Sequence, residues 1–172
     1  MNLQSDDFEL FAVPRRFAQD GAQLQERWKE LQRQAHPDRF AAQGAAAQRV
    51  AMQWSVRINE AYQRLKDPLK RAAYLCELHG SPIRAEDNTA MPAQFLMQQM
   101  QWREALEEAQ SAADLDALED DMQAARRAAI GRLETLIDQQ QDWPGAAREV
   151  RALMFIARFA QSIEQRQGQL QQ

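Results

Sequence analysis

The sequence predicts an all-α protein built from two helical modules. Ala, Gln, Leu, Glu and Arg dominate its 172 residues, and these residue types favour helices. Stretches that would form strands are almost absent, whereas apolar residues recur at spacings of three and four. A third observation is the segment 81–92, which holds two prolines and shows no periodicity. Such a segment marks a boundary between the modules.

Composition limits the class of protein. The chain is 45% hydrophobic and 27% charged and contains no run of 18 apolar residues, so we expect a soluble protein without a spanning helix. Residues 1–7 are acidic at their end and lack a signal-peptide pattern. The single cysteine, Cys76, excludes an internal disulfide and fits a cytoplasmic location. We expect Cys76 to be a buried, small apolar residue.

The net charge of −4 conceals a division along the chain. Residues 1–75 carry 12 Lys/Arg and 9 Asp/Glu, a balance of +3, whereas residues 76–172 carry 9 and 16, a balance of −7. Modules of opposite sign suggest two different partner surfaces. The alternative is a chance asymmetry between solvated faces.

The first module contains three main helical patterns after a short one. Asp6 and Asp7 can cap a short helix that Pro14 ends. An apolar stripe then predicts a helix over 24–35, and a longer stripe predicts one over 45–66. The stripe residues are Leu24, Trp28, Leu31 and Ala35 in the first, and Val50, Trp54, Ile58, Ala61, Tyr62 and Leu65 in the second. We expect the two helices to pair antiparallel, with a third helix over 69–78 after Asp67-Pro68.

The tripeptide His36-Pro37-Asp38 separates the two long patterns. Pro37 fixes its own φ and pushes His36 out of helical geometry, so the first helix should end here. The imidazole and the carboxylate are left at a rigid, exposed corner, which makes them functional candidates. A general-base pair is disfavoured, because residues on either side of a fixed proline cannot easily aim at one another and no activated nucleophile is evident.

The second module contains three helical patterns, over 93–109, 115–140 and 144–167. Short connections between long amphipathic helices predict an antiparallel three-helix bundle. The Gln-rich tail from residue 165 is expected to fray.

Two of these patterns are apolar on a second face. In the first, Phe95, Trp102, Leu106 and Ala109 form the expected core stripe, whereas Leu96, Met97 and Met100 fall on nearly the opposite face beside Glu104, Glu107 and Glu108. In the last, Val150, Leu153, Ala157 and Ala160 share a face, and Phe155 is expected to point outward. Methionines and an outward phenylalanine rimmed by acids suit a protein-docking surface. The alternative is that these side chains pack against the first module or a second copy.

The first module resembles a J domain, the part of co-chaperones that stimulates a DnaK-type ATPase. The resemblance depends on order and spacing: His36-Pro37-Asp38 after a basic helix, Ile58-Asn59-Glu60-Ala61-Tyr62, and Asp67-Pro68 followed by Arg71-Ala72-Ala73-Tyr74. Over about residues 7–165 the chain is similar to the HscB family, J-proteins of bacterial iron–sulfur cluster assembly. Further matching stretches are Leu31-Gln32-Arg33-Gln34, Leu78-His79-Gly80 and Phe95-Leu96-Met97.

The resemblance implies an L-shaped co-chaperone with a J domain at 1–80, a linker at 81–92 and a scaffold-binding domain at 93–172. It would stimulate a DnaK-type, HscA-like chaperone and deliver an IscU-like scaffold protein to it. The implied chaperone-binding residues are His36, Pro37, Asp38, Arg27, Lys29, Arg33 and Arg39, the last replacing the lysine usual in the family. The implied scaffold-binding residues are Leu96, Met97, Met100, Gln101, Glu104, Glu108 and Phe155, with Gln101 where the family often has an acid.

Other classes of function are less well supported by the sequence. Cys76 and His79 are only two ligands and do not make a closed zinc site. The paired-cysteine metal segment that some relatives carry at the N-terminus has no counterpart here, so we expect no metal, no cofactor and no enzymatic activity. We expect neither nucleic acid nor membrane as a partner, and a monomer. The main alternative is a helical adaptor that oligomerises through its second apolar faces.

Overall fold

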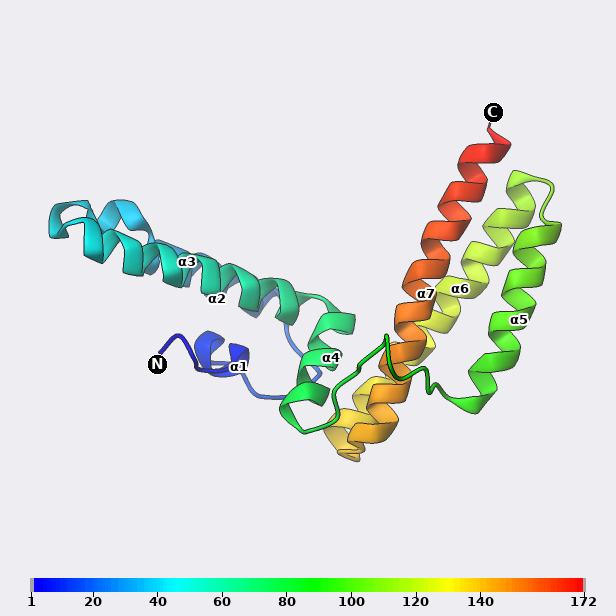
Figure 1. Ribbon diagram of the computed structural model, residues 1–172, viewed down its shortest axis with the longest axis horizontal. Coiled ribbons are helices and arrows are strands. Elements are labelled where there is room, and N and C mark those ends of the chain that lie inside the picture. The colour runs from blue at the N-terminus through cyan, green and yellow to red at the C-terminus, as the bar shows by residue number, and fades with distance from the viewer. Residues whose placement is uncertain (1, 172) are drawn as a thin grey trace. The chain divides into compact units, whose positions relative to one another are not determined.

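A computed structural model describes residues 2–171, and every regular element in this range is helical (Figure 1). The elements are α1 (Asp7–Phe11), α2 (Gly21–Ala35), the 3₁₀ helix η1 (Pro37–Gln43), α3 (Ala45–Lys66), α4 (Pro68–Leu78), α5 (Ala93–Glu108), α6 (Ala112–Glu134), the π-helical turn η2 (Thr135–Gln139) and α7 (Trp143–Leu170). The prediction of an all-α fold is confirmed. No helix within residues 2–171 is both long and apolar enough to cross a membrane.

Local capping sets where the helices begin. The carboxylate of Asp20 accepts the N–H of Ala22 at 3.0 Å, so α2 begins at Gly21, three residues before the predicted start. Asp67 accepts the N–H of Leu69 at 3.1 Å ahead of α4, as the Asp-Pro pair predicted. The bounds of α3 match the predicted range 45–66.

The N-terminal unit is centred on the antiparallel pair α2 and α3. The Trp28 ring stacks on Tyr62 with centroids 4.9 Å apart, and its Nε1–H donates to Oδ1 of Asn59 at 2.9 Å. The Gln32 amide donates to the same oxygen at 2.8 Å. The J-type motif residues Asn59 and Tyr62 therefore fasten the two helices, and the predicted pairing of α2 with α3 is confirmed.

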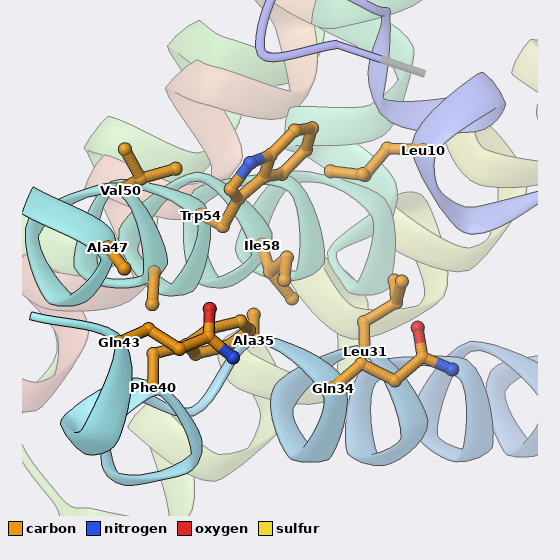
Figure 2. A pocket seen from close by; sticks show the side chains of 11 residues that line it. Leu10, Leu31, Gln34, Ala35, Phe40, Gln43, Ala47, Val50, Trp54 and Ile58 are labelled. Carbon is orange, nitrogen blue, oxygen red and sulfur yellow. The ribbon is translucent and has the colours of Figure 1, made fainter.

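An apolar groove of about 520 Å³ lies between this pair, α1 and η1 (Figure 2). Val50 and Trp54 of α3 contribute to one wall, and Phe40 of η1 contributes to the other. The hairpin is therefore well filled near Trp28 and incompletely filled near the turn that carries His36-Pro37-Asp38.

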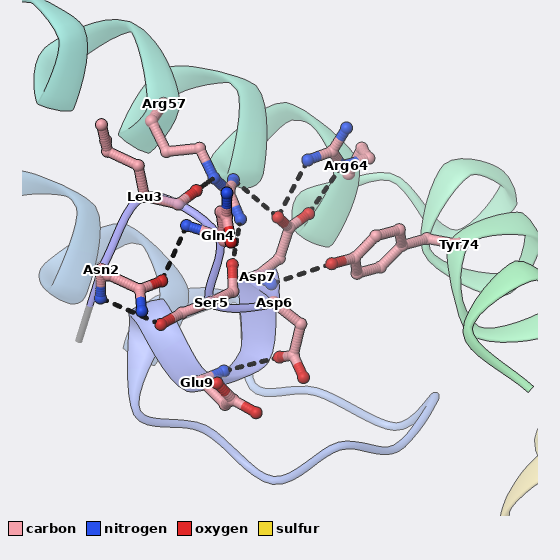
Figure 3. A network of polar contacts seen from close by, with 10 residues as sticks. All are labelled: Asn2, Leu3, Gln4, Ser5, Asp6, Asp7, Glu9, Arg57, Arg64 and Tyr74. Atoms are coloured by element: carbon pink, nitrogen blue, oxygen red, sulfur yellow. Dashed lines mark hydrogen bonds and ion pairs between the residues drawn. The ribbon is translucent and has the colours of Figure 1, made fainter.

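A buried carboxylate fixes α1 to the rest of this unit (Figure 3). Asp7 is fully buried and accepts two hydrogen bonds from Arg64, at 2.6 and 2.9 Å, and forms an ion pair with Arg57 at 2.8 Å. Its backbone N–H donates to the hydroxyl of Tyr74 at 3.0 Å. Asp6 is the actual N-cap of α1, accepting the N–H of Glu9 at 2.8 Å. Asp7 thus ties α1 to α3 and α4.

The C-terminal unit is a bundle of α5, α6 and α7, in which α6 and α7 make the most extensive contact. Its core combines large apolar side chains of the last two helices, namely Leu115, Leu118, Met122, Leu133, Val150, Ile156 and Ile163. Asp142 caps α7 by accepting the N–H of Gly145 at 3.0 Å. The predicted third helix therefore begins at Trp143 and extends to Leu170.

The chain divides into its two compact units after Leu75, inside α4. The segment 81–92, expected to be a linker, packs on the C-terminal unit. Arg151 of α7 donates from Nε to the carbonyl of Ile83 at 2.9 Å and from Nη1 to that of Ala90 at 3.1 Å. His79 also stacks on Trp143 with centroids 3.8 Å apart. This segment belongs structurally to the bundle.

Candidate functional site

The His36-Pro37-Asp38 corner lies between α2 and η1. His36 is the C-cap of α2, with extended backbone (φ −63°, ψ 128°), and Pro37 begins the 3₁₀ helix. This is the break that the proline predicted. The side chains of His36 and Asp38 are exposed, 57% and 90%, so both are accessible to a partner.

The two polar side chains of the corner approach one another, contrary to expectation. The backbone N–H of Asp38 donates to Nδ1 of His36 at 3.2 Å, and the Asp38 carboxylate lies 3.7 Å from the same nitrogen. The 3₁₀ turn that starts at Pro37 folds residue 38 back toward the ring. Because Nδ1 accepts a hydrogen bond, the neutral imidazole carries its proton on Nε2. The corner therefore presents an N–H donor beside a carboxylate.

The four predicted cations near the corner have different environments. Lys29 and Arg33 are four residues apart on the outer face of α2 and form no ion pair within residues 2–171. Arg27 is about 200° around the helix from Lys29 and lies 4.0 Å from Glu30. Arg39 donates to the carbonyl of Arg33 at 3.1 Å and so caps the end of α2. Only Lys29 and Arg33 form a shared, outward basic face.

The second candidate surface is on α5 and is called here the α5 patch. Leu96, Met97 and Met100 are 57%, 69% and 70% exposed, whereas Phe95 and Trp102 on the opposite face are buried. Exposed polar residues adjoin the patch, namely Gln101, Glu104 and Glu108. The prediction of a helix with an inward and an outward apolar face is confirmed.

The expectation that Phe155 points outward is wrong, because its side chain is only 9% exposed. Its ring packs edge-on against Phe95 at 5.7 Å and alongside Phe159 at 6.0 Å. The guanidinium of Arg103 lies 5.4 Å from its centroid. Phe155 therefore belongs to the aromatic cluster between α5 and α7.

The error arose from the choice of core face on the last helix. Ala157, assigned to that face, is exposed, whereas Phe159 on nearly the opposite side is buried. The first half of α7 is buried on almost every side, because α5, α6 and the segment 81–92 all pack around it. Assigning one apolar face to α7 from the sequence therefore could not show which side of the helix stays buried in its second half.

The residues considered for metal binding have packing roles. Cys76 is fully buried, as predicted, and burial raises the pKa of its thiol to about 11. His79 stacks on Trp143. Within residues 2–171, no group of three or more His, Cys, Asp or Glu side chains is placed to hold a metal ion.

Sequence reasoning missed Arg151, a buried arginine between Val150 and Ala152 on α7. A charged residue flanked by apolar neighbours in a helix is the signal that was available. Its partners are backbone carbonyls of the segment 81–92. Every residue has such a carbonyl, so the sequence does not show which ones bind Arg151.

Comparisons with known proteins cover both units. The family described as "HSCB C-terminal oligomerisation domain" matches residues 91–164, which include most of α5 to α7. A co-chaperone protein HscB homolog from Burkholderia thailandensis is 51% identical over 166 residues, covering 95% of this chain and 94% of the relative. The homolog from Burkholderia multivorans is 49% identical over the same length and the same shares of the two chains.

Two solved structures share the fold over nearly the whole chain. The chaperone HscB from Vibrio cholerae aligns with a TM-score of 0.80 and 36% identity, covering 96% of this chain and 99% of that one. The human co-chaperone protein HscB aligns with a TM-score of 0.88 and 29% identity, covering 97% of this chain and 84% of the human one. With about half of its residues identical to those of curated relatives along most of its length, the chain belongs to the HscB family of co-chaperones.

Proposed function

We propose that this co-chaperone stimulates the ATPase of a DnaK-type, HscA-like chaperone through the His36-Pro37-Asp38 corner. The observation that carries the proposal is the hydrogen bond from the Asp38 N–H to Nδ1 of His36, which leaves the other ring nitrogen and the Asp38 carboxylate exposed at the same corner. Because this hydrogen bond restrains the imidazole, His36 can bind a partner with a smaller loss of side-chain entropy. No reaction is assigned to the chain itself.

Lys29 and Arg33 are proposed to guide the chaperone to this corner. They lie on one face of α2, which ends at His36, and neither is neutralised by an ion pair within residues 2–171. Exposed cations of this kind accelerate encounter with an acidic surface more than they add affinity. Arg27 and Arg39 are expected to contribute less, because Arg27 is on a different face and Arg39 caps α2.

The α5 patch is the proposed contact for an IscU-like scaffold protein. Large exposed apolar side chains on one helix face are costly in water unless a partner covers them, and methionines adapt to such partners. Glu104 and Glu108 form no ion pair within residues 2–171 and would supply the polar rim. Phe155 would support scaffold binding indirectly, because its contact with Phe95 holds α5 against α7.

Joining both contacts in one chain would raise the effective concentration of the scaffold at the chaperone. We propose that this delivery is the biological role, in the maturation of iron–sulfur proteins. A chain with one cysteine, fully buried, suits the reducing cytoplasm where we place this role.

The test is steady-state ATP hydrolysis by the cognate chaperone, with this protein and the scaffold added separately and together. Substoichiometric amounts of the co-chaperone should accelerate hydrolysis, and the scaffold should increase the effect further. A chaperone whose rate is unchanged by a molar excess of this protein would contradict the proposal.

A second function, self-association, has one specific observation in its favour. The family description matched by residues 91–164 names an oligomerisation domain, and the same residues include the α5 patch. Light scattering after size-exclusion chromatography separates the two functions. A concentration-independent dimer that Leu96→Ser abolishes would show that the patch binds a second copy, whereas a monomer leaves it available to the scaffold.

A further inference from the structure

A cavity of about 320 Å³ in the C-terminal unit carries an unusual concentration of arginine. It lies between the segment 81–90 and the first turns of α7. Arg84, Arg148 and Arg151 line it, and no carboxylate does. Residues 76–172 contain 9 Lys/Arg and 16 Asp/Glu, so one third of the unit's cations surround this cavity in an acidic unit.

Arg151 is the fixed member of the group. Its side chain is only 6% exposed and is held by the carbonyls of Ile83 and Ala90. No carboxylate within residues 2–171 forms an ion pair with it. Burial of a guanidinium without a counter-ion is unfavourable, and a charge in that position normally has an anionic partner.

Arg148 increases the positive potential at the same place. It lies one turn of α7 before Arg151, and after burial it is the main cause that lowers the pKa of Arg151. Repulsion between neighbouring cations destabilises the unoccupied cavity, and an anion bound between them would relieve it. The clustered arginines therefore destabilise the unit while the cavity is empty and would stabilise a complex with an anion.

Arg84 approaches from the other wall. It has a left-handed backbone (φ 47°), and its carbonyl accepts the N–H groups of Asp87 at 2.9 Å and Asn88 at 2.7 Å. The guanidinium groups of Arg84 and Arg148 make no hydrogen bond or ion pair with residues 2–171. Two of the three cations are thus exposed and uncommitted.

The acids nearest in the sequence do not neutralise the cavity. Glu86 and Asp87 are exposed and form no ion pair within the described part of the chain. Asp142 is engaged as the cap of α7, and Glu149 is paired with Arg132 at 2.7 Å. No carboxylate in the described part of the chain therefore supplies a counter-charge to the three arginines.

From this arrangement we infer that the cavity binds a small multivalent oxyanion, carrying phosphate or carboxylate groups. Guanidinium groups match the paired oxygens of both. Arg151 would form the fixed base, and Arg84 and Arg148 would close over the ligand. Asn88 also lines the cavity; its Oδ1 already accepts the N–H of Ala90, so its amide N–H groups are available to donate. The volume suits a ligand of a few heavy-atom groups and is too small for a folded partner.

The direct test is calorimetric titration of the full chain with inorganic phosphate, pyrophosphate and citrate, at constant ionic strength set with chloride. Pyrophosphate or citrate should bind. The one with the higher affinity indicates whether the ligand carries phosphate or carboxylate groups. The double variant Arg84→Gln with Arg148→Gln should weaken binding at least about tenfold, because each guanidinium contributes a charge-assisted contact. Arg127→Gln, an exposed arginine of α6 outside the cavity, should bind like the parent.

NMR spectroscopy gives a second measure of anion binding that does not depend on the heat of binding. The Nε–H resonance of Arg151 should shift on addition of the bound anion and should not shift with chloride. Absence of binding up to about 10 mM of each anion would overturn the inference. Equal binding by the parent and the double variant, with both folded by circular dichroism, would also overturn it.

Discussion

The backbone N–H of Asp38 donates a hydrogen bond to Nδ1 of His36, 3.2 Å away across Pro37. This contact restrains the imidazole and leaves the proton of the neutral ring on Nε2. The tripeptide acts as a unit in this structure, and each residue has a separate physical task. Pro37 ends α2, His36 presents a donor, and Asp38 supplies both the hydrogen bond and the acceptor.

His36→Gln should abolish stimulation of the chaperone ATPase and leave scaffold binding unchanged. The flexible amide cannot accept the Asp38 N–H and present a donor with the geometry of the ring. Steady-state ATPase assays and calorimetry with the scaffold measure the two properties. Ala41→Ser, an exposed change in η1, is the matched control. Loss of both properties together in His36→Gln would contradict the separation of the two contacts.

Reversing charge on the outer face of α2 should slow encounter with the chaperone. Lys29→Glu with Arg33→Glu should raise the concentration for half-maximal stimulation about tenfold at low salt, since steering depends on exposed charge. The difference from the parent should shrink as ionic strength increases. Arg27→Glu, on a different face, should have a smaller effect. An equal effect of Arg27→Glu would show that the face was assigned incorrectly.

Polar substitution of the α5 patch should weaken scaffold binding without unfolding the bundle. Leu96→Ser with Met97→Ser removes two exposed apolar side chains, and we expect a loss of about 2–4 kcal/mol in binding if both are central contacts. The melting temperature should be unchanged. Met52→Ser with Val56→Ser, which alters two exposed apolar residues of α3, is the control and should bind the scaffold normally.

Phe155→Ala should behave differently, because Phe155 is buried against Phe95 and Phe159. The cavity left between α5 and α7 should lower the free energy of unfolding of the C-terminal unit by about 3–5 kcal/mol. Denaturant titration followed by circular dichroism measures this change. A variant with parental stability and weakened scaffold binding would instead restore Phe155 as a direct contact.

Asp7→Asn should destabilise the N-terminal unit by about 3–5 kcal/mol, because Arg57 and Arg64 would lose the anion between them. Thermal unfolding monitored by circular dichroism measures the loss. Asp6→Asn, which keeps a capping side chain, should cost about 1 kcal/mol or less. Similar losses in the two variants would mean that the buried triad adds little to stability.

Cys76 should be nearly inert in the folded protein. Burial raises the pKa of its thiol to about 11, from an ordinary value of 9.0, so little thiolate exists at pH 8. Alkylation by iodoacetamide at pH 8 should be about 100-fold slower in the native protein than in urea. Because the folded-state pKa is the higher one, this group stabilises the fold below pH 9, and that contribution is lost as pH rises toward 11. Equal rates in native protein and urea would contradict the burial.

Much of the fold could be predicted from local signals. The proline at 37, the Asp-Pro pair at 67–68 and the apolar stripe of α3 each act within a few residues, and the structure follows them closely. The outward face of α5 was also predictable, because one stripe of that helix is strongly aromatic and the other contains methionines. Local spacing sufficed wherever a helix has one inner face.

Three other features depend on contacts between residues that are not adjacent in the sequence pattern. The position of Phe155 depends on α5 and α6 contacting α7 from different sides, which no period in the sequence of α7 encodes. The role of Asp7 depends on Arg57 and Arg64, which lie more than 40 residues further along the chain. The contact between His36 and Asp38 required the 3₁₀ geometry of η1, which the proline alone did not imply.

Helix α1 has only five residues, far fewer than an isolated helix needs in water. Its attachment through Asp7 and Arg64 joins residues 57 positions apart, whereas α2 and α3 are connected by residues 36–44, which include η1. The hairpin can therefore form early, and α1 can add only after α3 exists. During folding the segment before residue 12 should remain open to proteases longest, and brief digestion of refolding chains should remove it before cutting within α2 or α3.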